Sequence, residues 1–298
     1  MNGVSVCITA YNAQDYIEEC LCSVASQTWF KTHDNWEIIV GIDGCDKTLQ
    51  KVKSIMNEFK NLRVMMMDSN KGTYITSNTI MSNAKYSNLF RFDSDDIMLP
   101  NLVETIMNKK EDCPFVRYKF RNFGKDQKTG VAWGTIYISK DVFDKYGGYM
   151  PWPCGADSEI YYRLVNFEKI KTIDEVLMLR RVHEESLTQS KKTGMKSLLR
   201  KKYQQIINSM KINPVENPII DCVKNTYSEI VSECNDNFNE KSVNYYINMH
   251  ANDEDENIHS KKPTKKEKTR IQQLREDIEA GRVIKVPTTT GFIWKRVK

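Results

Sequence analysis

Several patterns that mark common protein classes are missing from this sequence. No apolar run comes near the roughly 20 residues that cross a bilayer, and the N-terminus enters "VSVCITAYN" without a basic segment or a small-residue cleavage site. We therefore expect neither a transmembrane segment nor a signal peptide. The eight cysteines form no CxxC pair and are scattered through 298 residues, a length that needs no disulfide staples. Reduced thiols, a cytoplasmic location and no structural zinc site are the expectation.

Acidic residues are scarce in two C-terminal stretches, although the whole chain carries a formal charge of only +5. Residues 190–212 contain seven basic and no acidic side chains, and residues 258–298 contain twelve basic and four acidic ones. The rest of the chain is therefore acidic overall. The sequence, with 40% hydrophobic residues, predicts an acidic N-terminal domain, 1–190, and a helical, basic C-terminal region, 191–298, suited to an anionic acceptor or partner.

The first hundred residues alternate between apolar, β-branched runs and segments with helical periodicity. Strands are predicted over 4–11, 36–43, 62–68 and 88–93, with helices between them over 13–27, 47–59 and 71–84. This alternation indicates an α/β fold whose mainly parallel sheet is flanked by helices. Such sheets bind ligands beyond the carboxyl ends of their strands. The residues that fall there are Tyr11, Asn12, Asp43, Asp93 and Asp95.

The pattern changes beyond Pro100. Strands are predicted over 115–123, 131–139 and 170–182, and an amphipathic helix over 157–167. Further helices are predicted over 195–210, 219–234 and 264–281, with a polar linker over 250–268.

The segment "NLFRFDSDDIMLP", residues 88–100, runs an apolar strand into three carboxylates, Asp93, Asp95 and Asp96. Carboxylates this close repel one another unless a positive charge lies between them. An Asp-x-Asp pair can give two oxygens to a divalent cation and leave positions open for the phosphate oxygens of a nucleoside diphosphate. The alternative is a solvated acidic turn in which Asp96 complements the dipole of a following helix. A calcium loop fits less well, because Met98 stands where such a loop needs glycine.

Five segments follow one another in an order that resembles the family 2 inverting glycosyltransferases of the GT-A fold. They are "VSVCITAYN", "IIVGIDGCDKT", "NKGTYITSNTIMSNAKYSNLFRFDSDD", "GYMPWPCGADSEIYYRL" and "RRVHEESLT". The resemblance covers residues 1–190. It implies a GT-A type, Rossmann-like sheet and a metal-dependent, inverting transfer of a single sugar from a nucleoside-diphosphate sugar. A UDP-sugar is the usual donor in this family, and Mn²⁺ or Mg²⁺ is the implied cofactor.

The resemblance also implies roles for individual residues. It assigns contacts with the nucleotide to Thr9, Ala10, Tyr11, Asp43, Asn78, Arg91, Asp93 and Ser94. It assigns the divalent ion to Asp95, Asp93 and His183, although a lone His on a strand is often structural. Asp157 is implied as the general base that takes the proton of the acceptor hydroxyl. Trp152 is a candidate to stack on the acceptor ring, or else it packs as a plug for its loop.

The sequence departs from the family pattern at three points. Ala156 stands where the family has Glu, so Glu159 is a rival for the role of the base. Ser77 stands where the family has Arg, so Arg91 or Arg180 is a candidate to supply a cation instead. The Gln-x-x-Arg-Trp motif of processive polymer synthases is absent, and this absence favours the transfer of one sugar.

The acceptor and the partners are left open by the sequence. A glycan or lipid-linked glycan is the first expectation, and DNA bases, as in phage-type DNA modification, are the alternative. The basic C-terminal region then contacts an anionic membrane surface or nucleic-acid phosphates, unless it is simply a solvated face. Either acceptor suits a cytoplasmic or membrane-peripheral enzyme of bacterial or viral origin. A catalytically weak nucleotide-sugar binding protein is a further alternative, whereas a nucleotidyltransferase is disfavoured because no Gly-rich phosphate loop follows the first strand.

Overall fold

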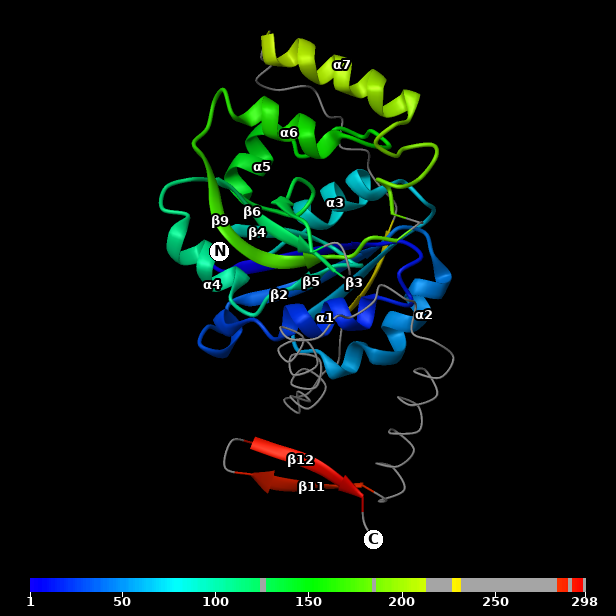
Figure 1. Ribbon diagram of the computed structural model, residues 1–298, viewed down its shortest axis with the longest axis vertical. Coiled ribbons are helices and arrows are strands. Elements are labelled where there is room, and N and C mark those ends of the chain that lie inside the picture. Colours follow the sequence, from blue (N-terminus) through cyan, green and yellow to red (C-terminus); the bar gives the residue numbers. More distant parts are fainter. Residues whose placement is uncertain (124–126, 184–185, 213–226, 232–282, 289–290, 297–298) are drawn as a thin grey trace. The chain divides into compact units, whose positions relative to one another are not determined.

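A mixed sheet with helices on both faces forms the body of the protein between Met1 and Asn257 (Figure 1). The computed structural model describes residues 1–123, 127–183, 186–212, 227–231, 283–288 and 291–296. The strands of this sheet are β1 (Val4–Ala10), β2 (Trp36–Ile42), β3 (Leu62–Met67), β4 (Asn88–Asp93), β5 (Ile97–Met98), β6 (Phe115–Asn122), β7 (Thr129–Val131), β8 (Ile136–Ser139), β9 (Ile170–Arg180) and β10 (Tyr227–Val231). The helices are α1 (Ile17–Ala25), α2 (Asp46–Ile55), α3 (Thr73–Ser82), α4 (Leu102–Lys109), α5 (Lys140–Tyr146), α6 (Ala156–Leu164) and α7 (Leu198–Ile212). No helix among these described residues is both long and apolar enough to cross a membrane.

The first four strands confirm the predicted parallel arrangement. β1 pairs in parallel with β2 on one side and with β4 on the other, and β3 lies outside β2. Every residue of β1 is buried, because a central parallel strand is covered on both faces. The strand order reverses beside β1, and α/β sheets bind ligands outside the carboxyl ends of the strands at such a point. Thr9 of β1 and Asp93 of β4 are register partners there.

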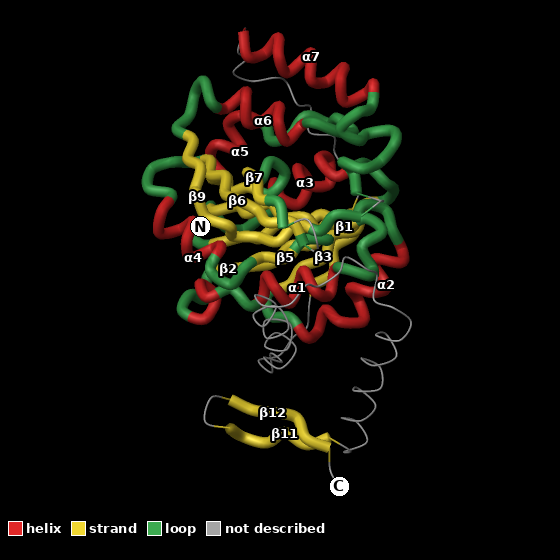
Figure 2. The backbone as a smooth tube through the Cα atoms, in the orientation of Figure 1, coloured by secondary structure: helices red, strands yellow, loops and turns green. Residues whose placement is uncertain are grey.

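Two apolar cores hold the helices on the two faces of the sheet. The first contains residues of α1, α2 and α4, and the second contains residues of α3, α5 and α6. Leu21, Val52 and Leu102 belong to the first core, and Ile80, Phe143 and Ile160 belong to the second. Alternation along β1 serves both, since Val6 and Ile8 point to the first core and Cys7 to the second. Figure 2 shows the resulting layers, with helices in red on both sides of the yellow strands.

The second half of the sheet joins segments that are far apart in the sequence. β8 pairs antiparallel with β4, β6 pairs with β8, and β9 pairs in parallel with β6. β5 pairs antiparallel with β9, so the chain just after the Asp-x-Asp segment is held beside the end of β9. The strand predicted over 131–139 is interrupted, because Thr129–Val131 pairs with β6 and Ile136–Ser139 pairs with β4.

The C-terminal region is only partly helical. α7 confirms the helix predicted over 195–210. The prediction of a helix over 219–234 is wrong for Tyr227–Val231, which form β10 and pair antiparallel with β3, a contact that covers an otherwise open strand edge. In a second unit, Ile258–Lys298, the strands β11 (Val283–Thr288) and β12 (Gly291–Arg296) pair antiparallel. The linker over 250–268 and the helix over 264–281 lie outside the described residues, and the domain boundary at residue 190 stays a prediction.

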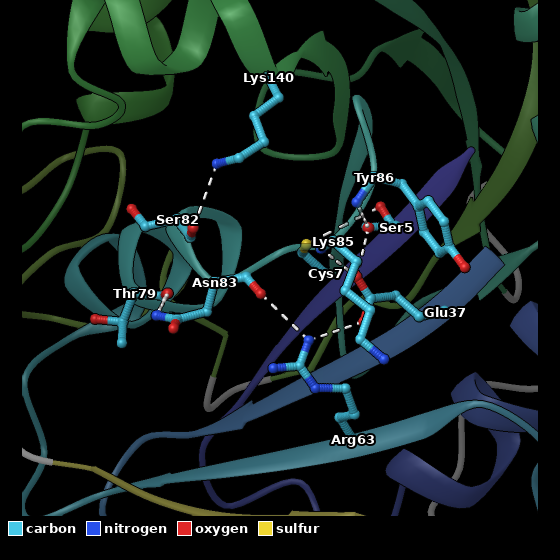
Figure 3. A network of polar contacts seen from close by, with 10 residues as sticks. All are labelled: Ser5, Cys7, Glu37, Arg63, Thr79, Ser82, Asn83, Lys85, Tyr86 and Lys140. Carbon is cyan, nitrogen blue, oxygen red and sulfur yellow. Dashed lines mark hydrogen bonds and ion pairs between the residues drawn. The ribbon is translucent and has the colours of Figure 1, made fainter. Parts of the chain in front are cut away.

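A buried polar network ties the amino ends of the first three strands together, at the end opposite the Asp-x-Asp segment (Figure 3). Glu37 is only 2% exposed. Its carboxylate accepts hydrogen bonds from Ser5 Oγ at 2.7 Å and from the Lys85 backbone N–H at 2.6 Å, and it pairs with Arg63 Nη1 at 2.8 Å. Arg63 also donates to the Asn83 carbonyl at 3.2 Å. The network therefore fastens the loop between α3 and β4 to β1, β2 and β3.

Removing the Glu37 charge is expected to destabilise the fold strongly. Glu37→Gln leaves the Arg63 guanidinium, which is only 12% exposed, without its carboxylate. We expect the free energy of unfolding, measured by urea titration with circular dichroism, to fall by about 3 kcal/mol. Glu175→Gln is the matched control, because the Lys109–Glu175 pair is exposed and such pairs contribute less than about 1 kcal/mol. Equal losses for the two variants would contradict a stabilising role for the network.

Candidate active site

The carboxyl ends of β1 and β4 bring several of the predicted nucleotide-side residues to one edge of the sheet. Thr9 and Ala10 end β1 and are buried, whereas Tyr11 is 51% exposed. Ser94 follows β4 and is also buried. Asn12 has a left-handed backbone with a φ of 51°, a conformation that Asn tolerates better than most residues. Tyr11 and Asn12 are therefore the members of this group whose side chains are exposed.

Arg91 supplies a buried positive charge beneath this edge. It is 3% exposed, and its Nη1 lies 2.6 Å from Asp93 Oδ1. Its Nη2 donates to the hydroxyls of Thr9 at 3.2 Å and Thr73 at 2.9 Å, and its Nε donates to Ser77 Oγ at 3.4 Å. The guanidinium from β4 thus lies against Ser77, the position where the sequence lacks the family's Arg.

The two candidate cations differ in position. Arg180 donates from Nε to Asn122 Oδ1 at 3.0 Å and lies over the ring of Phe120, so it is engaged within β6 and β9. Arg91 faces the carboxylates directly. Burial raises the pKa of Asp93 above its usual range, while the charge of Arg91 lowers it. Of the two, Arg91 is the cation that the structure brings to the Asp-x-Asp segment.

Asp95 and His183 meet, although 88 positions separate them in the sequence. His183 Nε2 lies 2.8 Å from Asp95 Oδ2, and both side chains are partly exposed. The pairing of β5 with β9 explains the contact, because it holds the end of β9 beside the Asp-x-Asp segment. The third predicted metal ligand, Asp93, is paired with Arg91 instead.

The Asp95–His183 pair fits a divalent cation that is shared with a substrate. Among the described residues, no group of three or more His, Cys, Asp or Glu side chains could hold a metal ion by itself. Mg²⁺-type sites commonly use one or two protein carboxylates and complete their coordination with substrate phosphates and water. One carboxylate and one imidazole at a strand end are compatible with that kind of site.

Asp96 has a role that the sequence does not reveal. It is 4% exposed, and its Oδ1 accepts a hydrogen bond from the Arg181 backbone N–H at 2.8 Å. Arg181 Nε also donates to the Asp95 carbonyl at 3.0 Å, and its guanidinium pairs with Glu19. Burial raises the pKa of Asp96 well above its usual range. Asp96 therefore fastens β9 to the Asp-x-Asp segment, and the alternative of a solvated turn that complements a helix dipole is wrong.

Asp157, from a different element, lies near the same group of charges. It lies in the first turn of α6, is half-buried, and accepts a hydrogen bond from Ser158 N at 2.9 Å. Burial raises the pKa values of Asp93, Tyr74 and Tyr149, and the charge of Asp157 raises all three further. Asp157 thus lies close enough to Asp93 for the two charges to interact.

Two buried tyrosines that were not predicted from the sequence lie near Asp157. Tyr74 opens α3 and packs against Tyr149, with ring centroids 5.4 Å apart. The Tyr149 hydroxyl is buried and has no hydrogen-bond partner among the described residues. No local motif marks either residue, because their position depends on the contact between α3 and the segment before α6.

The rival base Glu159 is committed to the fold. It is 0% exposed, and its two carboxylate oxygens pair with Arg163 Nε at 2.7 Å and Nη2 at 3.1 Å. Arg163 in turn donates to the carbonyls of Tyr146 and Gly148 at 2.5 Å each. Burial raises the pKa of Glu159, and the Arg163 charge lowers it. Through Arg163, Glu159 holds the turn that leads into the Asp157 segment, and both of its carboxylate oxygens are engaged there.

Asn78 and Asp43, both predicted nucleotide contacts, make bonds to the backbone. Asn78 accepts from Tyr149 N at 2.9 Å and donates to Tyr149 O at 2.7 Å. Asp43 accepts from Lys71 N at 2.6 Å, from Gly72 N at 2.9 Å and from Thr76 Oγ1 at 3.0 Å. A carboxylate at the start of α3 is favourable, because it satisfies free N–H groups and the helix dipole. Contacts of these residues with a nucleotide stay a prediction.

Trp152 packs within the protein on one of its faces. Its ring stacks on Tyr203 of α7, with centroids 4.5 Å apart and an interplanar angle of 23°. The loop of Trp152 is therefore covered by α7. Acceptor stacking by Trp152 stays a prediction, restricted to the ring surface that Tyr203 leaves free.

Residues 5–156, just over half of the chain, match the family described as "Glycosyl transferase family 2". The chain belongs to this family. Among its curated relatives, an uncharacterized glycosyltransferase of Haemophilus influenzae is 29% identical over 160 residues, which are 50% of this chain and 48% of the relative. The putative teichuronic acid biosynthesis glycosyltransferase TuaG of Bacillus subtilis is 32% identical over 95 residues, 31% of this chain and 36% of TuaG. The matched part thus spans about half the length of these relatives or less.

Two solved structures share the fold of this family 2 chain. S. aureus TarS 1–349, in complex with UDP-GlcNAc, has a TM-score of 0.54 at 20% identity, over 62% of this chain and 60% of that one. The mannosyltransferase PcManGT from Pyrobaculum calidifontis, in complex with GDP-Man and Mn²⁺, has a TM-score of 0.56 at 15% identity, over 72% and 65%. The predicted GT-A type α/β fold is confirmed.

Glu159 and Asp157 are expected to respond differently when their charges are removed. Glu159→Gln takes the buried partner from Arg163, so the free energy of unfolding should fall by about 3 kcal/mol. Asp157→Asn should change it by less than about 1 kcal/mol, because the side chain is half-buried and its loss relieves repulsion with Asp93. Urea unfolding of both variants measures this difference. An unchanged unfolding midpoint for Glu159→Gln would return Glu159 to the candidates for the base.

Proposed function

We propose that the protein transfers a single sugar, with inversion, from a nucleoside-diphosphate sugar to a hydroxyl of a glycan or lipid-linked glycan, with Mn²⁺ or Mg²⁺. One observation carries this proposal: Asp157, in the first turn of α6, lies close enough to Asp93 and Arg91 at the end of β4 for its charge to raise the pKa of both. The Asp95–His183 pair lies at the same strand end. One carboxylate is thus available for an acceptor proton, and a separate group of residues is available for the diphosphate.

Asp157 is the proposed general base. An inverting transfer needs a carboxylate on the face of the sugar opposite the leaving diphosphate. The hydrogen bond from Ser158 N occupies one lone pair of Asp157 Oδ1 and leaves further acceptor sites for a hydroxyl. As the hydroxyl oxygen attacks the anomeric carbon, its proton moves to the Asp157 carboxylate, and the bond from that carbon to the diphosphate oxygen breaks.

The proposed diphosphate side combines Asp95 and His183 with the buried cation. Asp95 and His183 would hold the divalent ion, which when bound neutralises the charge that develops on the departing diphosphate. Arg91 is enclosed by its partners, so its role is to fix Asp93 and to reduce the repulsion among the carboxylates. The unpaired Tyr149 hydroxyl lies near the same charges and is a candidate donor to the sugar nucleotide.

A UDP-sugar is the proposed donor, and a glycan is the proposed acceptor. The complex of TarS with UDP-GlcNAc supports a UDP-sugar. The complex of PcManGT with GDP-Man and Mn²⁺ supports a divalent metal and makes GDP-sugars the second donor to test. The name of TuaG connects a relative with teichuronic acid, which is in keeping with a glycan acceptor. Nothing in the described residues or in these relatives favours a DNA acceptor.

Slow release of nucleoside diphosphate from one donor is expected in a panel of UDP-, GDP-, dTDP- and CDP-sugars with Mn²⁺, because water can replace the acceptor. Asp157→Asn and Asp95→Ala should each lower this release by about a hundredfold or more. EDTA should abolish it, and Glu175→Gln, which alters an exposed carboxylate, is the control. Nucleotide binding without release would instead support the catalytically weak binding protein. The proposed transfer would be overturned if no donor were bound and no donor released its nucleoside diphosphate.

The two sides of the site should separate in a binding experiment. Asp95→Ala and His183→Ala are expected to weaken Mn²⁺-dependent binding of the nucleoside diphosphate by about tenfold or more. Asp157→Asn should leave this binding within about twofold, because its carboxylate is assigned to the acceptor. Isothermal titration calorimetry with and without Mn²⁺ measures both effects. The assignment is wrong if Asp157→Asn weakens binding as much as Asp95→Ala does.

A further inference from the structure

The segment from Leu187 to Lys202 presents apolar side chains to solvent. Met195 is 67% exposed and Leu198 is 83% exposed, and Leu187 is 39% exposed. Single exposed apolar residues are common, but three within one short segment need a reason. We call this segment, residues 187–202, the basic apron.

The basic apron is also strongly positive. Residues 187–202 contain six basic side chains and no acidic one. All five lysines of the apron are exposed: Lys191, Lys192, Lys196, Lys201 and Lys202. The segment itself contains no acidic side chain, so its charges are not neutralised from within, and we expect the surface to attract an anionic partner.

The helical register shows that Leu198 is not required by the core. The inward side of α7 is buried or half-buried at spacings of three and four. These residues are Leu199, Tyr203, Ile206, Ile207 and Met210. Leu198 lies outside this stripe and shares the outer face with Lys201 and Lys202, three and four positions on. An apolar side chain among lysines on an outer face has no packing function within the described residues.

We propose that the basic apron docks on the surface of a bilayer that contains anionic phospholipids. Lysines near such a surface gain electrostatic attraction, and apolar side chains between them enter the boundary between headgroups and acyl chains. A nucleic acid would satisfy the lysines but would leave Met195 and Leu198 in water. The combination of both features therefore favours lipid.

The apron adjoins the acceptor side of the site. Tyr203 stacks on Trp152, and its Cβ lies 3.8 Å from where a Cβ on Gly155 would be, directly before α6. The charge of Arg200 lowers the pKa values of Cys154 and Tyr74 against the effect of burial, so α7 begins close to the residues around Asp157. Figure 1 shows α7 alongside α6. Resting on the proposed function, this arrangement makes the acceptor a glycan carried on a membrane lipid.

Vesicle flotation of the full chain tests the docking. The vesicles contain phosphatidylcholine with or without phosphatidylglycerol, at low and high salt. We expect binding only with phosphatidylglycerol, and weaker binding at high salt. The combined change Lys196→Gln, Lys201→Gln and Lys202→Gln should lower the partition coefficient by on the order of a hundredfold. Leu198→Ser should lower it by about tenfold.

A matched variant separates the apron from the general charge of the protein. Lys31→Gln, Lys53→Gln and Lys60→Gln together remove the same charge from exposed lysines elsewhere, and should change partitioning by less than about threefold. Residues 258–298 carry twelve further basic side chains, which could bind vesicles by themselves. The comparison between the two triple variants, and not vesicle binding alone, therefore tests whether the apron docks. Equal effects of the two triple variants, or no effect of Leu198→Ser, overturn the proposal. So does salt-sensitive binding to a DNA duplex in place of vesicles.

The same variants keep this proposal distinct from the transferase proposal. The apron variants should release nucleoside diphosphate at the unaltered rate in solution, because none of the changed residues lies among the proposed site residues. Vesicle binding without release from any donor would leave the docking intact and remove the transfer. Release of nucleoside diphosphate without lipid-dependent binding would support the transfer and overturn the docking.

Discussion

The site depends on the ion pair and hydrogen bonds that hold the buried guanidinium of Arg91. A charge removed from water costs several kcal/mol unless it is paired and hydrogen-bonded. The partners of Arg91 come from three elements, because Thr9 ends β1, Thr73 opens α3 and Asp93 ends β4. These elements must therefore meet at the point where the strand order reverses. Gly134 closes the same region, since a Cβ there would lie 3.0 Å from Arg91 Nη1.

Around this cation, burial and hydrogen bonding separate the crowded carboxylates into structural groups and groups that are free for the proposed reaction. Asp43 and Asp96 are buried and accept hydrogen bonds from backbone N–H groups, so their carboxyl groups hold loops in place. Asp93 is bound to Arg91. Asp95 and Asp157 remain partly exposed, one beside His183 and the other at the start of α6. A cluster that looks uniform in sequence thus becomes two separated carboxylates with different partners, as a reaction with an attacking and a leaving group requires.

The elements that could be predicted from sequence are those whose signal is local. β1 and β2 are continuous apolar runs because both their faces are covered, and the Asp-x-Asp segment follows directly from the end of β4. Pairing between segments that are far apart in the sequence has no such local signal. Tyr227–Val231 lies within a helical pattern but pairs with β3, and Glu159 resembles a candidate base until Arg163 is seen beside it. Asp95 and His183 could be linked only through the resemblance, since the β5–β9 pairing that joins them involves two residues of β5.

The proposed donor and acceptor sides of the site are built differently, and under the proposed function this difference bears on specificity. The donor side rests on strand ends within a sheet buried on both faces, where a shift of one residue would disturb the pairing of neighbouring strands. The acceptor side rests on a loop held by side chains, through Asn78 to Tyr149, Arg163 to Gly148 and Tyr203 to Trp152. Substitutions in that loop or in α7 can reshape the acceptor side while Arg91 and its partners stay in place. One sheet can therefore keep its sugar-nucleotide chemistry while the acceptor changes.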